Sequence, residues 1–217
     1  MLVEACVTTS TEAMSSWRAG AHRLELCEHL DVDGLTPSLA LLQRVRAEVP
    51  IPIRVMVRPR AGTFCMTVAE VQVMQVQMQE LGAHGADGFV LGVTTPNGEV
   101  DFLALETLLT AAKGIPVTFH RAFDGVVQMA QALAEFRDLG VASVLTSGGS
   151  GTAWLNRRAL TSLCTLSQGH PEIILAGSVR GDHVAQLARE TGATAIHARA
   201  SAIPEITRAL SEKAPKG

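Results

Sequence analysis

Gly88-Phe-Val-Leu-Gly-Val93 begins the stretch of sequence that decides the fold. It continues through Leu103-Ala-Leu-Glu-Thr-Leu-Leu-Thr-Ala-Ala112 to Ile115-Pro-Val-Thr-Phe-His120. The two outer segments are short and apolar, which is typical of buried strands. The middle segment has the apolar spacing of a helix that lies on a sheet, and Gly114 stands where that helix should end. Strand, helix and strand at this spacing predict a parallel βαβ unit.

Apolar runs of the strand type recur along the whole chain. They lie at residues 2–7, 22–27, 51–57, 88–93, 115–120, 142–146, 172–176 and 194–198. Eight runs in 217 residues give about 27 residues per unit, which is enough for one strand and one helix. The intervening segments have helical periodicity. One example is the stripe formed by Val68, Val71, Met74, Met78 and Leu81.

These units predict an α/β fold, namely a single (β/α)8 TIM-type barrel with parallel strands, formed by residues 1–212. The alternative is a doubly wound open sheet, which usually has fewer strands and a glycine-rich turn after the first one. Here the first strand leads into Val7-Thr-Thr-Ser-Thr11, which contains no glycine. The barrel is therefore the favoured fold, with residues 213–217 as a short polar tail.

Composition and charge exclude several classes of protein. Hydrophobic residues make up 47% of the chain and charged residues 18%, which excludes a disordered protein. A net charge of −3 offers no basic surface for nucleic acid, and no apolar run reaches the ~20 residues of a membrane span. We therefore expect a cytoplasmic protein without nucleic-acid or membrane partners. Its four cysteines are too few for a disulfide scaffold and are expected to be reduced thiols.

Two predicted strands repeat a Glu-x-Cys pattern. Because side chains alternate between the faces of a strand, Glu4 and Cys6 share one face of the first strand. Glu25 and Cys27 do the same on the second strand. The opposite faces are apolar, so we expect both carboxyl groups and both thiols to point into the barrel. Buried carboxylates need partners, and the arginines expected to supply them are Arg54, Arg58 and Arg60.

Further polar residues follow the predicted strands at their carboxyl ends, where a barrel enzyme holds its active site. They are Arg58, Arg60, His120, Arg121, Asp124, Thr146, Ser147, Gly148, Gly149 and His197. A charged pair such as His120-Arg121 has no role in an apolar core. The turn at residues 146–149 offers backbone N–H groups to an anion. We therefore treat these residues as candidate ligands of a small phosphorylated or carboxylated molecule.

One hypothesis from these residues is a cofactor-independent enzyme of the lyase or isomerase type. Either Glu4 or Glu25 would act as the base and His120 as the proton donor. Arg58 and Arg121 would hold the anionic group of the substrate. The opposing interpretation is structural, with the carboxylates as ion-pair partners inside the barrel and the cysteines as ordinary buried residues. The residues alone leave both interpretations open.

Six stretches of the chain together resemble the CutC copper-homeostasis family. They are Glu4-Ala-Cys-Val7, Arg23-Leu-Glu-Leu-Cys27, Gly34-Leu-Thr-Pro-Ser38, Val55-Met-Val-Arg-Pro-Arg60, Val117-Thr-Phe-His-Arg-Ala-Phe-Asp124 and Leu145-Thr-Ser-Gly-Gly149. They occur in order from the first predicted strand to the sixth, and the last two form a highly specific combination. The resemblance implies a (β/α)8 barrel, a cytoplasmic location, homo-oligomers and binding of Cu(I). The copper ligands proposed for the family fall on Cys6 and Cys27.

The chain departs from the family pattern in loops near the barrel mouth. Arg60-Ala-Gly-Thr-Phe64 lacks the carboxylate usual in that loop, and the turn Ala176-Gly-Ser-Val-Arg180 is shortened. Both candidate copper ligands are retained. Thiolates suit the soft Cu(I) ion, and parallel strands ~4.8 Å apart bring two of them within reach of one ion. No nucleotide or organic cofactor is expected.

A second apolar stripe lies on the helix predicted around residues 68–81. Ala69, Val73 and Val76 lie opposite the stripe that faces the sheet. A small apolar surface of this kind suits a contact between two copies of the chain. We therefore expect a homo-oligomer, with a dimer favoured.

Overall fold

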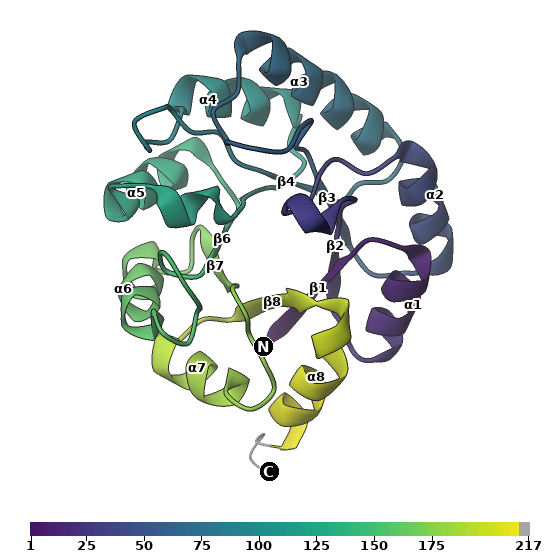
Figure 1. The fold of residues 1–217 in the computed structure, drawn as a ribbon, viewed down its shortest axis with the longest axis vertical. Coiled ribbons are helices and arrows are strands. Elements are labelled where there is room, and N and C mark those ends of the chain that lie inside the picture. The colour runs from purple at the N-terminus through teal and green to yellow at the C-terminus, as the bar shows by residue number, and fades with distance from the viewer. Residues whose placement is uncertain (213–217) are drawn as a thin grey trace.

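Eight parallel strands close into a barrel, and helices form a ring around it (Figure 1). The computed structural model describes residues 1–212. The strands are β1 (Leu2–Val7), β2 (Arg23–Leu26), β3 (Ile53–Met56), β4 (Gly88–Leu91), β5 (Val117–Phe119), β6 (Ser143–Thr146), β7 (Glu172–Leu175) and β8 (Ala195–Arg199). The helices are α1 (Ser10–Arg18), α2 (Leu39–Glu48), α3 (Val68–Ala83), α4 (Phe102–Ala111), α5 (Met129–Leu139), α6 (Arg157–Ser167), α7 (Val184–Thr191) and α8 (Ile203–Glu212). Short 3-10 helices are η1 (Leu30–Val32), η2 (Arg121–Gly125) and η3 (Ala200–Ala202).

The predicted barrel is confirmed, with each strand in its expected place. The first seven predicted runs contain the observed strands, and the eighth is displaced by one residue. The predicted polar tail, residues 213–217, lies outside the described residues. Within the described part of the chain, none of the helices has the length and apolar character needed to cross a bilayer.

Helix α3 shows how the sequence determines which face is buried. Thr67 and Glu70 form a capping box, in which each side chain accepts a hydrogen bond from the other residue's backbone N–H. The buried residues of the predicted stripe are Val71, Met74, Met78 and Leu81. The prediction is wrong for Val68, which is 78% exposed. At ~100° per residue, Val68 falls about 60° outside the arc of buried side chains.

The main apolar core lies between the barrel and its helices. Outward-facing strand residues such as Leu24, Leu26 and Phe89 are completely buried there. The barrel interior is different, because several of its buried side chains are polar or charged; they include Glu4, Arg23, Glu25, Arg54, Thr118 and Ser143. Such groups are costly to bury unless they are paired. Their contacts therefore distinguish a structural layer of the barrel from a layer available for function.

The register between β1 and β2 sets these layers. Glu4 lies opposite Arg23, and Cys6 lies opposite Glu25 one layer higher. Cys27 directly follows the end of β2. Helix η1, dark blue in Figure 1, lies over the opening of the barrel, and its residue Leu30 lines the same cavity as Cys6 and Glu25. The carboxyl-terminal mouth is thus the place where a site can form.

Candidate functional site

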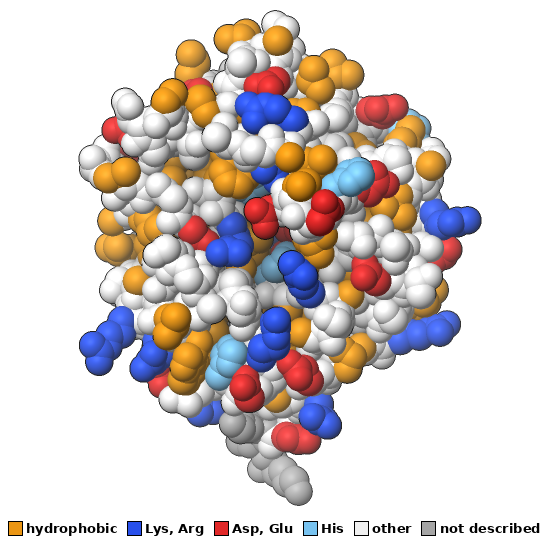
Figure 2. Space-filling model, in the orientation of Figure 1, with side chains coloured by type: hydrophobic (Ala, Val, Ile, Leu, Met, Phe, Trp, Pro, Cys, Tyr) orange, Lys and Arg blue, Asp and Glu red, His pale blue; other side chains and the backbone are white. Residues whose placement is uncertain are grey.

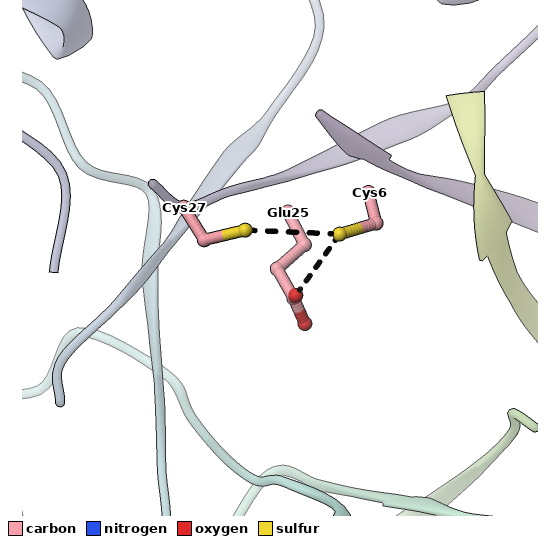
Figure 3. Close-up of side chains that lie close together, drawn as sticks. All are labelled: Cys6, Glu25 and Cys27. Carbon is pink, nitrogen blue, oxygen red and sulfur yellow. Dashed lines mark hydrogen bonds between the residues drawn. The ribbon is translucent and has the colours of Figure 1, made fainter. Parts of the chain in front are cut away.

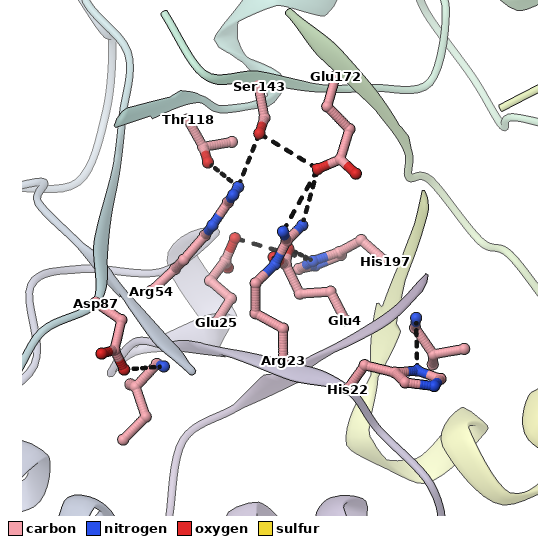
Figure 4. A network of polar contacts seen from close by, with 12 residues as sticks. Glu4, His22, Arg23, Glu25, Arg54, Asp87, Thr118, Ser143, Glu172 and His197 are labelled. Atoms are coloured by element: carbon pink, nitrogen blue, oxygen red, sulfur yellow. Dashed lines mark hydrogen bonds and ion pairs between the residues drawn. The ribbon is translucent and has the colours of Figure 1, made fainter. Parts of the chain in front are cut away.

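A network of charged side chains fills the amino-terminal half of the barrel (Figure 4). Arg23 forms a hydrogen-bonded ion pair with Glu4, and its guanidinium lies 3.4 Å from a carboxylate oxygen of Glu172. Arg54 donates a hydrogen bond of 2.9 Å to the hydroxyl of Ser143. Because these charges partner one another, this lower layer holds the barrel together rather than offering free groups to a ligand.

These contacts correct the partner expected for Glu4. Arg23, which the sequence analysis did not single out, takes that place because the register sets it directly opposite Glu4. Arg54 contributes to the electrostatic field at Glu4 but makes its own hydrogen bonds to hydroxyl groups across the barrel.

The two arginines after β3 are bound to loops and to α3. The guanidinium of Arg58 donates hydrogen bonds to the backbone carbonyl groups of Val32, Gly34 and Gly62. Arg60 forms an ion pair with Glu70 at the start of α3. Neither arginine lines the cavity described below. The structure therefore gives Arg58 and Arg60 the role of fastening loops, where the sequence analysis expected carboxylate partners and anion ligands.

His197 lies between the two buried carboxyl groups. Its Nδ1 is 2.9 Å from Oε1 of Glu4 and 3.9 Å from Oε2 of Glu25. Burial alone would raise the pKa of Glu4, but the hydrogen bond with His197 and the charge of Arg23 outweigh it and lower this pKa to about 2. Burial would likewise lower the pKa of His197, but Glu25 and Glu4 raise it. Glu4 is thus a fixed anion beneath the mouth, and Glu25 is the carboxyl group that lines the cavity.

Two thiols and one carboxyl group meet at the ends of β1 and β2 (Figure 3). The sulfur atoms of Cys6 and Cys27 are 3.8 Å apart. The Cys6 thiol also donates to Oε1 of Glu25 at 3.6 Å. Both cysteines are buried and pack with Met56 and Val90. The expected convergence of Cys6, Cys27 and Glu25 is confirmed, whereas Glu4 lies one layer deeper.

The donor set of this cluster fits a soft metal ion. One ligand atom from each of Cys6, Glu25 and Cys27 lies within 4.8 Å of the others. The hydrogen bond with Cys27, burial and the charge of Glu25 raise the pKa of Cys6 well above its ordinary value, so this thiol keeps its proton until a cation replaces it. Oε2 of Glu25 is buried and has no hydrogen-bond partner among residues 1–212. A cation bound beside it would offset this buried negative charge.

A cavity of about 430 Å³ opens above the cluster at the carboxyl-terminal mouth. Figure 2 shows blue basic and red acidic side chains around this central hollow and histidine within it, and the basic residues that line it are arginines. The candidate residues from the sequence that line the cavity are Cys6, Glu25, His120, Arg121 and His197.

His120 presents an unpartnered nitrogen to this cavity. Its side chain is 4% exposed, and burial together with the charge of Arg58 lowers its pKa to about 3. Nδ1 accepts a hydrogen bond of 3.1 Å from the backbone N–H of Ala122. The neutral ring therefore carries its proton on Nε2, which is buried and has no partner within the described chain. His120 is thus a neutral hydrogen-bond donor in a residue that lines the mouth cavity.

The turn after β6 binds a carboxylate of the chain itself. Asp124 accepts hydrogen bonds from the hydroxyl of Thr146 and from the backbone N–H of Ser147, at 2.6 and 2.8 Å. Arg121 donates to the same carboxylate at 2.9 Å. Neither Asp124 nor residues 146–149 line the cavity. The donors that the sequence offered to an external anion are therefore used to fix Asp124.

Two arginines of the cavity were missed as candidates. Arg180 lies in the loop after β7, and Arg199 is the last residue of β8. Arg199 carried a readable signal, because it follows His197 by two residues and so shares the inward face of its strand. Arg180 carried none, because a loop has no periodicity that determines where its side chains point.

Comparison with known proteins gives consistent matches. A family model described as "CutC family" matches residues 1–202. A human protein named "Copper homeostasis protein cutC homolog" is 36% identical over 92% of this chain and 73% of its own length. A CutC family protein of Agrobacterium fabrum is 38% identical over 94% of this chain and 81% of its own length. The crystal structure of a putative copper homeostasis protein CutC from Streptococcus agalactiae superposes with a TM-score of 0.87 at 29% identity, covering 91% of this chain and 97% of that one.

Proposed function

The chain belongs to the CutC family of copper-homeostasis proteins, and we propose that it binds Cu(I) between the thiolates of Cys6 and Cys27. The observation that carries this proposal is the 3.8 Å separation of the two sulfur atoms at the barrel mouth. Thiolates are the ligands that select soft ions such as Cu(I). The other two cysteines, Cys65 and Cys164, lie outside the cavity lining and outside the thiol cluster.

The spacing of the thiols suits a single ion. With metal–thiolate bonds of ~2.3 Å, the length known for zinc, a 3.8 Å separation corresponds to an S–metal–S angle of about 110°. A small outward movement of either side chain opens this angle towards a linear arrangement. The bent arrangement instead leaves one side of the ion facing the carboxyl group of Glu25. Either arrangement keeps the ion at the floor of the cavity.

Binding requires the thiols to exchange protons for the metal. Because the pKa of Cys6 is raised, protons compete with Cu(I), and the apparent affinity is expected to increase with pH. All four cysteines are free thiols, which suits a reducing compartment. We therefore propose a cytoplasmic location for this activity.

An anaerobic Cu(I) titration against a chromophoric chelator tests the proposal. We expect one tightly held Cu(I) per chain in the wild-type protein and its loss in Cys6→Ser/Cys27→Ser. The matched control is Cys65→Ser/Cys164→Ser, which also removes two thiols and should bind as the wild type does. Circular dichroism verifies that each variant is folded. Tight binding that persists without Cys6 and Cys27, or that is lost equally in the control, would contradict the proposal.

A second candidate is an acid–base enzyme acting on a small anionic substrate. The observation in its favour is that Glu25 lines the cavity with an unpartnered buried oxygen and a pKa raised by burial. His120 faces the same space as a hydrogen-bond donor. Incubating the protein in deuterated water with small carboxylated and phosphorylated carbonyl compounds would show proton abstraction as deuterium uptake by NMR. Deuterium uptake that is abolished in Glu25→Gln supports this candidate. The absence of deuterium uptake with every compound tested would exclude it.

A further inference from the structure

We propose that the cavity at the barrel mouth binds a small organic anion, whose carboxylate or phosphate group is held by Arg180 and Arg199 and whose further oxygen accepts a hydrogen bond from Nε2 of His120. This site is distinct from the thiol cluster in its ligand groups, and its occupation does not require a metal ion. It goes beyond metal binding and deepens the second candidate function, because it assigns the residues that hold the anion, but binding of the anion does not require any reaction at Glu25.

Arg180 and Arg199 are cationic groups without an acidic partner. No ion pair within residues 1–212 involves either guanidinium. The one side-chain hydrogen bond of Arg180 goes to the backbone carbonyl of the adjacent Val179. Arg121, which lines the same cavity, is instead paired with Asp124. Two guanidinium groups that line one cavity and lack carboxylates leave their bidentate donor faces for an external anion.

The position of the two arginines in the barrel supports the same conclusion. Arg180 follows β7 and Arg199 ends β8. Barrel enzymes frequently bind phosphate with the loops at this part of the carboxyl-terminal face. The loop after β7 also packs closely against the turn after β6. A Cβ on Gly177 would lie 2.7 Å from Cβ of Ser147, so only glycine lets this loop reach its position.

His120 supplies a second observation that points to a ligand. His120 lines the cavity, and its Nε2–H is buried and lacks a partner among the described residues, although Nδ1 is satisfied by Ala122. A buried donor without a partner carries a desolvation cost that an acceptor on a ligand would remove. Because the ring is neutral, it suits a carbonyl or hydroxyl oxygen, while the guanidinium groups suit the charged end. Phe64, which packs on the His120 ring at 4.7 Å, adds an apolar wall.

The size and charge of the cavity restrict the ligand further. A volume of about 430 Å³ is at the lower end of the range for small-molecule sites, which suits a compact anion. Two carboxyl groups also line the space, Glu25 beside the thiols and Asp33 after η1. They disfavour an anionic group near themselves and so direct it towards Arg180 and Arg199. A molecule with one anionic end, held by the two arginines, and one neutral oxygen, held by His120, matches this arrangement of charges.

Isothermal titration with glycerol 3-phosphate, which has one phosphate group and neutral hydroxyl oxygens, in the presence of a metal chelator and at low salt, tests the site. Inorganic phosphate and glycolate, run separately, distinguish the phosphate from the carboxylate as the charged group. We expect Arg180→Gln and Arg199→Gln each to weaken binding of the effective probe about tenfold, the effect of losing one charge-assisted hydrogen bond. Asp33→Asn should strengthen binding. Arg158→Gln, on the exposed face of α6, removes the same charge away from the cavity and should change affinity less than twofold.

Side-chain nitrogen NMR of His120 provides the second measurement. The free protein should show a neutral ring protonated at Nε2, and this resonance should shift as the probe saturates the site. Failure of all three anions to bind the wild-type protein would overturn the proposal. So would equal weakening by Arg158→Gln, which indicates diffuse attraction, or binding that leaves the His120 resonance unchanged. The thiol proposal is tested separately, because Cys6→Ser/Cys27→Ser should still bind the anion.

Discussion

Glu25 contacts three parts of the site at once. Its Oε1 accepts the hydrogen bond of Cys6, its Oε2 lies 3.9 Å from His197, and its carboxyl group lines the cavity. Burial raises its pKa, the charge of Glu4 adds to this rise, and His197 opposes it. At the same time its charge contributes to the raised pKa of Cys6. The protonation of the thiol therefore depends on this carboxylate as well as on Cys27 and on burial.

Replacing Glu25 should make the thiol more acidic. In Glu25→Gln the carboxylate charge beside Cys6 is absent, so we expect a lower pKa for Cys6 than in the wild type. The thiolate absorbance in the ultraviolet, followed against pH in the Cys65→Ser/Cys164→Ser background, measures this change. Glu80→Gln, on the exposed side of α3, is the control and should leave the curve unchanged. An unchanged or raised pKa in Glu25→Gln would show that its charge does not act on the thiol.

His120 should make stability fall as the solution is acidified. Its folded pKa of about 3 lies below the ordinary value of 6.5, so above pH 6.5 the ring is neutral in both states. Between pH 6.5 and pH 3 only the unfolded state takes up the proton, which lowers the free energy of unfolding by up to ~1.4 kcal/mol per pH unit. Denaturant unfolding of wild type and His120→Gln at several pH values isolates this contribution, since the other groups are common to both. Parallel curves for the two proteins would contradict it.

At the scale of single elements, the sequence predicts which strand residues point inward but not which of them meet. Alternation places Glu4, Cys6, Glu25 and Cys27 inside the barrel, and the structure agrees. The pairing of Glu4 with Arg23 depends on the register between two strands, which no local pattern reveals. Alternation also stops being informative where a strand ends. Arg58 lies two residues beyond β3, and its guanidinium binds loop carbonyl groups instead of lining the cavity.

Strand β4 contributes a glycine that makes room for His120. A Cβ on Gly92, directly after β4, would lie 2.4 Å from Cε1 of the His120 ring. Gly92→Ala should therefore displace the ring and destabilise the protein by about 1–3 kcal/mol, the usual cost of overpacking. Gly125→Ala is the matched control, because a Cβ there meets no atom within 4 Å. Chemical denaturation measures both variants, and equal stability for the two would contradict the close packing at Gly92.

At the scale of the whole molecule, the barrel interior is divided into two layers. The lower layer pairs its charges internally through Glu4, Arg23 and Glu172. In the upper layer the two thiols contact each other and Glu25, while one carboxylate oxygen of Glu25 and the imidazole N–H of His120 have no hydrogen-bond partner within residues 1–212. Burying apolar side chains here would cost less free energy than burying these polar groups. The polar groups are therefore better explained by a ligand than by stability. The sequence could indicate that the barrel interior is polar. Only the closed barrel shows which polar groups near the mouth lack a hydrogen-bond partner within the described residues.

We propose that the exposed apolar stripe on α3 is a contact between copies of the chain. Val73 and Val76 on α3 are 47% and 64% exposed, and Ala69 beside them is also exposed. We expect Val73→Lys/Val76→Lys to shift the protein from dimer to monomer, because burying two unpaired ammonium groups in a contact is unfavourable. Multi-angle light scattering on both proteins measures the mass. A monomeric wild type, or a variant that remains dimeric, would exclude this surface as the contact.

X-ray absorption at the copper edge tests the central claim most directly. The sample is Cys65→Ser/Cys164→Ser loaded anaerobically with one equivalent of Cu(I), so that Cys6 and Cys27 are its only thiols. We predict two sulfur ligands in the copper shell, both lost in the variant that also lacks Cys6 and Cys27. A shell of nitrogen or oxygen ligands, or a single sulfur, would show that the two thiols do not hold the ion together.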